Sequence, residues 1–152
     1  MRRIRRTRSG EIRVRLPEHE RALLREIAAV TRQRLAAEGD DPALRRLFPP
    51  AYADAERDRE YQDLMRGQLQ SGRRRALEVL ESTVEQSSLS AEEADAWLRA
   101  LNDARLVLGT ELDVDEDLDW NGIGHDDPQA VEYAVYGYLS WIQEQLIEAT
   151  AR

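Results

Sequence analysis

The sequence predicts a mainly α-helical single domain, with an N-terminal β-hairpin packed on a bundle of about four long helices. Three observations point to this fold. Apolar residues recur at spacings of three and four over four long stretches, which places them on one face of a helix. Alternation of apolar and charged residues, the period of a strand, is confined to the first 16 positions. The 152 residues are also the size of one ordinary domain with its own core.

The first element is a predicted β-hairpin in residues 2–16, RRIRRTRSGEIRVRL. Apolar residues alternate with arginines in its second arm, Ser9-Gly10 is a turn signal, and Ile4 stands on the first arm. A lone hairpin is only marginally stable in water, so its apolar side should pack on the helices while the arginines line the outer face. The second arm, Glu11 to Leu16, could pair with its own chain or with another subunit.

The first helix is predicted from Pro17 to Glu38. Proline favours the first helical position, and Gly39 follows the expected end. After it, a single turn between Asp41-Pro42 and Pro49-Pro50 should bring three apolar residues to one end of the core: Leu44, Leu47 and Phe48.

The second helix is predicted from about Asp54 to Gln86. Glycine is unfavourable inside a helix, so Gly72 suggests a kink or a close helix crossing. A polar loop, Gln86 to Leu89, should join this helix to the next.

The stretch from Ala91 to Leu112 predicts the central helix, because it is apolar on nearly all sides and must be surrounded by other elements. Ser90 and Glu93 have the spacing of a capping box, which marks its start. Asp103 and Arg105 interrupt the apolar pattern, and we interpret them as a buried structural ion pair. The main apolar face consists of Ala94, Trp97, Leu98, Leu101, Ala104, Leu108 and Leu112.

The last helix should begin with Asp127 as its cap and Pro128 at its first position. Additional aromatic residues surround it on several sides, which indicates either a subunit interface, and hence a homodimer, or burial within the monomer. Its predicted buried stripe consists of Val131, Ala134, Val135, Tyr138, Leu139, Ile142, Leu146 and Ala149.

The charge of the chain is unevenly distributed. The net charge is −8, yet residues 1–34 hold 11 arginines and four acids, a local charge of +7, and the remaining 118 residues carry −15. Such asymmetry is typical of an interaction surface. All 22 basic residues are arginine, and there is no cysteine, which excludes disulfides and thiol redox chemistry. We expect a cytoplasmic protein, since the sequence contains no signal peptide or membrane-spanning run.

The arginine-rich hairpin is the best candidate for a functional site. Arginines on a β-ribbon can reach phosphates or groove edges of DNA, and the residues we expect to supply these contacts are Arg3, Arg5, Arg6, Arg13 and Arg15. Two alternatives stay open. The arginines could protect an edge strand from pairing with other chains, or they could pair with the acidic remainder of the same chain. The acidic remainder would also oppose the approach of DNA.

A weaker candidate is a calcium loop after the central helix. Asp117, Asp119 and Asn121 match the opening of such a loop, but its twelfth position, which needs a bidentate glutamate, is Pro128. A solvated acidic loop is the simpler interpretation, and we predict no other metal site and no cofactor. The sequence also contains no nucleophile elbow, phosphate loop or dinucleotide fingerprint, so we do not expect an enzyme.

Four segments resemble one family: LPEHERALLREI (16–27), DPALRRLFPPAY (41–52), WLRALNDARLVLGTEL (97–112) and YLSWIQEQL (138–146). It is the actinobacterial domain-of-unknown-function family that includes AosR-type oxidative-stress regulators, commonly encoded beside the Clp protease adaptor ClpS. The resemblance implies a non-catalytic, cytoplasmic regulator acting on transcription. Thiol-based sensing does not carry over, because this chain has no cysteine.

The resulting functional prediction is a transcription-associated regulator that contacts DNA or a transcription-machinery protein through the hairpin. The alternative is a protein-interaction module with no direct DNA binding, linked to Clp proteolysis through gene neighbourhood. In that case the hairpin would meet an acidic protein surface.

Overall fold

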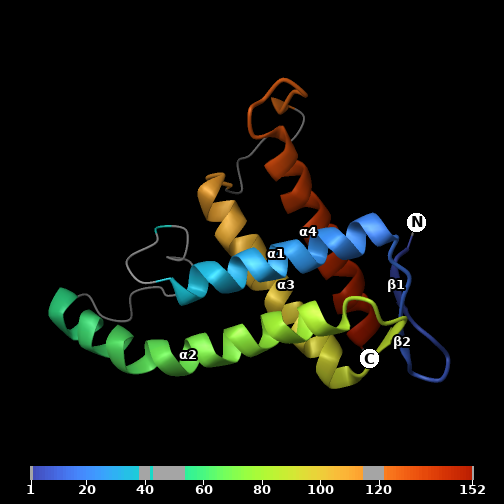
Figure 1. Cartoon of the computed structure of the whole chain (residues 1–152), viewed down its shortest axis with the longest axis horizontal. Coiled ribbons are helices and arrows are strands. Elements are labelled where there is room, and N and C mark those ends of the chain that lie inside the picture. Colours follow the sequence, from blue (N-terminus) through green and yellow to red (C-terminus); the bar gives the residue numbers. More distant parts are fainter. Residues whose placement is uncertain (1, 38–41, 43–53, 115–121, 152) are drawn as a thin grey trace.

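The computed structural model describes residues 2–37, 42, 54–114 and 122–151, leaving aside the side chains of 61–69. The elements run in the order β1 (Ile4–Arg6), β2 (Ile12–Val14), α1 (Glu18–Ala36), α2 (Ala55–Thr83), β3 (Ser88–Leu89), α3 (Ala91–Glu111) and α4 (Ala130–Thr150) (Figure 1). The mainly helical fold with an N-terminal antiparallel strand pair confirms the predicted class. The predicted turn that carries Leu44, Leu47 and Phe48 lies outside the described residues.

Helix α3 is the centre of the bundle, as its apolar composition predicted. It contacts α1, α2 and α4, so side chains on several of its faces are buried, including Val107, which lies off the main apolar face and is 4% exposed. The capping box is present: the Ser90 hydroxyl accepts from the Glu93 backbone N–H at 3.1 Å, and the Glu93 carboxylate accepts from the Ser90 N–H at 2.9 Å. Trp97 is fully buried, and its indole N–H donates to the Thr83 hydroxyl of α2 at 2.7 Å.

Strands β1 and β2 pair antiparallel within the chain, with Ile4 opposite Val14. Gly10 adopts a φ of 88° in the turn between them, a left-handed conformation that favours glycine. The predicted loop from Gln86 to Leu89 is wrong in its second half, where β3 adds a third strand with Leu89 opposite Ile12. Two residues are too few to show the alternation by which a strand is identified, so this strand depends on the neighbouring β2.

Helices α1 and α2 lie side by side (Figure 1). Ion pairs join them along their length: Arg25 pairs with Glu85, and Arg32 pairs with Glu81 at 2.9 Å. Helix α2 runs without interruption through Gly72, and a Cβ there would meet nothing within 4 Å. No close helix crossing therefore requires that glycine.

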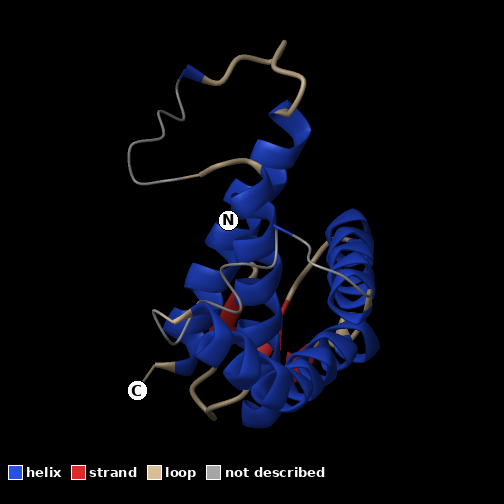
Figure 2. Cartoon of the chain, turned by 90° about the vertical axis from the view of Figure 1, so that its left-hand side faces the viewer, coloured by secondary structure: helices blue, strands red, loops and turns tan. Residues whose placement is uncertain are grey.

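Helix α4 starts later than predicted, at Ala130. The Asp127 carboxylate accepts from the Gln129 N–H at 2.8 Å and so caps a single turn that precedes the helix. The first turns of α4 extend beyond α1 (Figures 1 and 2). Val131 is therefore 72% exposed and Ala134 is exposed, although both were predicted to be buried. The rest of the stripe is buried or half-buried. None of the described helices is long and apolar enough to cross a bilayer.

The predicted ion pair of α3 has a different partner. Asp103 pairs with Arg73 of α2, whereas Arg105 donates to the amide oxygen of Asn102 at 3.3 Å. Residues two apart on a helix point in different directions, so Asp103 and Arg105 cannot face each other. Burial raises the pKa of the Asp103 carboxyl, and the Arg73 guanidinium opposes that shift.

The capping box gives a first prediction for stability. Replacing Ser90→Ala removes the acceptor for a first-turn N–H of the central helix, which should lower the free energy of unfolding by about 1 kcal/mol. Urea denaturation followed by circular dichroism measures this change. Ser87→Ala is the control, because Ser87 is exposed and outside the cap. Equal losses in the two variants would show that the cap contributes nothing specific.

Asp103 gives a prediction of pH dependence. Because its pKa is higher in the folded state than in the unfolded state, its contribution to stability is complete below the ordinary carboxyl pKa and is lost as the pH rises through the folded value. The wild type should therefore lose stability relative to Asp103→Asn as the pH rises above the ordinary carboxyl value of about 4. Urea denaturation at several pH values tests this. Asp95 is an exposed acid of α3 and serves as the control. If the wild type lost stability relative to Asp95→Asn over the same pH range, the assignment to Asp103 would be contradicted.

Candidate functional site

One side chain of α4 binds the backbone of the N-terminal hairpin. Oε1 of the buried Gln145 accepts from the backbone N–H of Arg3 at 2.6 Å and from that of Ile4 at 3.0 Å. A strand of three residues has few pairing partners of its own, so these two bonds satisfy N–H groups that would otherwise be buried without an acceptor. The hairpin thereby takes a fixed orientation on the end of the bundle.

A second contact reaches the hairpin from α1. Glu20 is 6% exposed, and its carboxylate accepts from the Arg3 guanidinium at 3.0 Å and from the Tyr138 hydroxyl at 2.7 Å. The same guanidinium lies 5.9 Å from the ring centroid of Trp141, a cation–π distance. Burial and the hydrogen bond to Glu20 raise the pKa of Tyr138 far above its usual range. The hydroxyl therefore remains a donor at physiological pH.

The sequence pattern alone did not indicate that Glu20 and Gln145 hold the hairpin. Both stand at stripe positions of their helices, Glu20 four residues before Leu24 and Gln145 three residues after Ile142. A polar residue at such a position, where an apolar one is expected, is the signal that could have revealed them.

Three arginines form one face of the β-ribbon, which we call the arginine face: Arg5, Arg13 and Arg15. Successive residues of a strand point to opposite sides, and Ile4, Ile12 and Val14 are buried on the other side. Arg5 stands directly opposite Arg13, a like-charge pair that is unfavourable for folding. Arg5 and Arg15 are exposed and make no side-chain hydrogen bond or ion pair with the described part of the chain. Arg13 lies 3.4 Å from the Glu11 carboxylate.

The other two predicted contact residues lie away from the arginine face. Arg3 is half-buried against Glu20 and Trp141, where it holds the hairpin. Arg6 is exposed, and its guanidinium donates to the Ala151 carbonyl at the end of α4 at 3.4 Å. The structure therefore brings together three of the five predicted arginines on one open surface.

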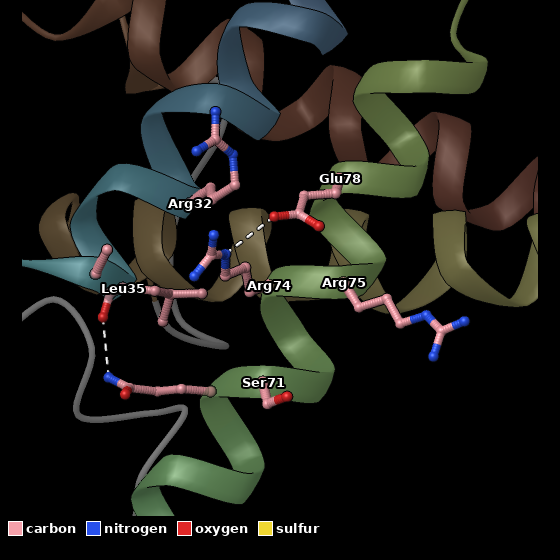
Figure 3. A pocket seen from close by; sticks show the side chains of 8 residues that line it. Arg32, Leu35, Ser71, Arg74, Arg75 and Glu78 are labelled. Carbon is pink, nitrogen blue, oxygen red and sulfur yellow. Dashed lines mark hydrogen bonds and ion pairs between the residues drawn. The ribbon is translucent and has the colours of Figure 1, made fainter.

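A second basic region is a pocket of about 510 Å³ between α1 and α2 (Figure 3). Arg74 pairs with Glu78 at 2.9 Å, and Arg32 pairs with Glu81. The side chain of Arg75 points away from the pocket in Figure 3. Two of the three arginines that line this pocket, Arg32 and Arg74, thus neutralise nearby acids, and we do not assign an anion site to it.

The calcium candidate, Asp117, Asp119 and Asn121, lies outside the described residues. Among the residues that are described, no three His, Asp or Glu side chains gather as they would to hold a metal ion. His19 is exposed and lies 3.9 Å from Glu20.

Fold and site define a class: a small, mainly helical protein that presents an arginine-bearing β-ribbon at one end of its bundle. The chain matches the family described as "Domain of unknown function (DUF2017)" over residues 1–150, and it belongs to that family. It is also 32% identical over 129 residues to a Mycobacterium leprae (strain TN) protein named "Putative oxidative stress regulator AosR". The alignment covers 72% of this chain and 58% of that relative. No solved structure matches the chain.

The anchoring of the hairpin is testable at Gln145. Gln145→Met keeps the size of the side chain but removes the acceptor, which leaves two N–H groups unsatisfied and should cost about 1–3 kcal/mol of stability. Hydrogen exchange at Arg3 and Ile4 should become faster, as measured by NMR. Gln143→Met is the control, because this neighbouring residue makes only a 3.5 Å contact with Asn102. Unchanged exchange at both amides would contradict the anchoring role.

Proposed function

We propose that this chain is a non-catalytic regulatory protein that binds DNA through the arginine face. The M. leprae relative is named as an oxidative stress regulator, and this name supports a regulatory role here. No thiol can mediate a response in this chain, because it contains no cysteine. The regulatory signal must therefore act through other chemistry.

The like-charge pair of Arg5 and Arg13 is the observation that carries the DNA proposal. Two arginines held opposite each other on a ribbon repel in the free protein, and a polyanion that lies across them relieves this repulsion. Arginine also forms bidentate hydrogen bonds with phosphate. Arg15, at the end of the same face, extends the positive surface along the ribbon.

The acidic body limits how DNA can approach. Residues after position 34 carry a charge of −15, so a duplex would approach the hairpin end of the bundle and avoid the rest. Figure 1 shows β1 and β2 at one end of the molecule, beside the C-terminal end of α4. At this position DNA can contact the ribbon without approaching the acidic rest of the bundle.

The salt dependence of DNA binding tests the proposal. A fluorescently labelled random-sequence duplex should bind, with an affinity that falls steeply with salt. The triple variant Arg5→Gln, Arg13→Gln, Arg15→Gln should bind more weakly and show a salt slope lower by roughly one unit for each phosphate that the variant no longer neutralises. Fluorescence anisotropy across a salt series measures both quantities.

The matched control removes the same charge elsewhere, by Arg57→Gln, Arg59→Gln and Arg75→Gln on exposed positions of α2. Its salt slope should equal that of the wild type. If both triple variants lose affinity equally, the effect is one of net charge and the ribbon is not the site. If the wild type does not bind the duplex at low salt, the arginine face serves a protein partner.

A further inference from the structure

An open apolar groove lies between α1, α3 and α4, with a volume of about 400 Å³. Val107 and Leu108 of α3 form its floor, Ile27 and Val30 of α1 form one wall, and Val131 and Val135 of α4 form the other. The two wall helices have little direct contact with each other, because α4 extends past α1 (Figure 1). The floor is therefore only partly covered between them: Leu108 is half-buried, whereas Val107 is buried.

Two of the apolar side chains that line the groove are exposed to solvent. Val131 is 72% exposed and Val30 is 47% exposed. The other large exposed apolar residues of the described chain, Trp141 and Ile147, do not line this groove. Exposed apolar side chains on both walls of one groove mark a docking surface.

Acidic residues rim the groove on both walls. Glu26 stands on α1 and Glu132 on α4, and both are exposed and make no ion pair with the described residues. The one arginine of the rim, Arg34, pairs with the third acid, Glu111. The rim is therefore net negative and selects a partner with positive charge on both sides of an apolar stripe.

We propose that this groove binds an amphipathic helix of a partner protein, one whose apolar stripe is flanked by lysine or arginine. The wall from Val131 to Leu139 extends about 12 Å along α4 at 1.5 Å per residue. This length matches a helix that inserts apolar residues at positions i, i+4 and i+7. A second copy of this chain fits less well, because its groove presents the same acids and like charges would meet. The proposal is independent of DNA binding at the arginine face.

Two labelled helical peptides of about 15 residues test the proposal, with the same leucine stripe flanked by arginine in one and by glutamate in the other. The arginine-flanked peptide should bind in fluorescence anisotropy, and Val131→Asp should weaken it at least roughly tenfold. Val131→Asp leaves folding intact, because the residue is exposed and an acid is favourable in the first turn of α4. Ile147→Asp on the same helix is the control and should bind as the wild type does.

A charge reversal tests the rim separately. Glu26→Arg with Glu132→Arg should make the glutamate-flanked peptide the better ligand, whereas Glu60→Arg with Glu144→Arg, on exposed acids outside the groove, should not. Equal binding of both peptides to the wild type, or no effect of Val131→Asp, would overturn the proposal. Analytical sedimentation gives a further test. A dimer of the wild type that Val131→Asp abolishes would also overturn the proposal, because the groove would then be occupied by a second copy of this chain.

Discussion

The amide oxygen of Gln145 determines where the arginines of this protein lie. Strands of three residues cannot form a stable sheet by themselves, and β1 takes its position from the two hydrogen bonds that this oxygen accepts. The buried Glu20 then holds Arg3 against Trp141 and Tyr138. With the inner side of the ribbon fixed in this way, its outer side presents Arg5, Arg13 and Arg15.

Most of the positive charge in the first 34 residues is used within the fold. Arg25 and Arg32 pair with acids of α2, and Arg34 pairs with Glu111 of α3. Each of these partly exposed pairs contributes little stability, but together they favour one alignment of α1 on its neighbours. The charge asymmetry of the sequence therefore has three origins: pairing between helices, the attachment of the hairpin through Arg2 and Arg3, and the arginine face.

The two proposed interaction surfaces lie toward opposite ends of α4. The hairpin contacts this helix near Gln145 and Glu148, and the apolar groove lies along its first turns. A helix of 21 residues is about 30 Å long, so a duplex on the arginine face and a helix in the groove would not collide. The two proposed contacts, nucleic acid on the basic surface and a protein helix on the acidic one, are therefore compatible with each other in space.

The sequence by itself determined the helices, the capping box, the central position of α3 and the hairpin, because periodicity and caps are local signals. Only the tertiary structure decided which polar residues are buried. Glu20, Asp103 and Gln145 are stable inside because partners distant in the sequence satisfy them, and no local pattern reveals such partners. The structure likewise separated the structural Arg3 from Arg5 and left Val131 exposed. Arg3 differs from Arg5 because Glu20 and Trp141 lie beside it, and Val131 is exposed because α4 extends past α1. The residues of a single helix or strand encode neither outcome.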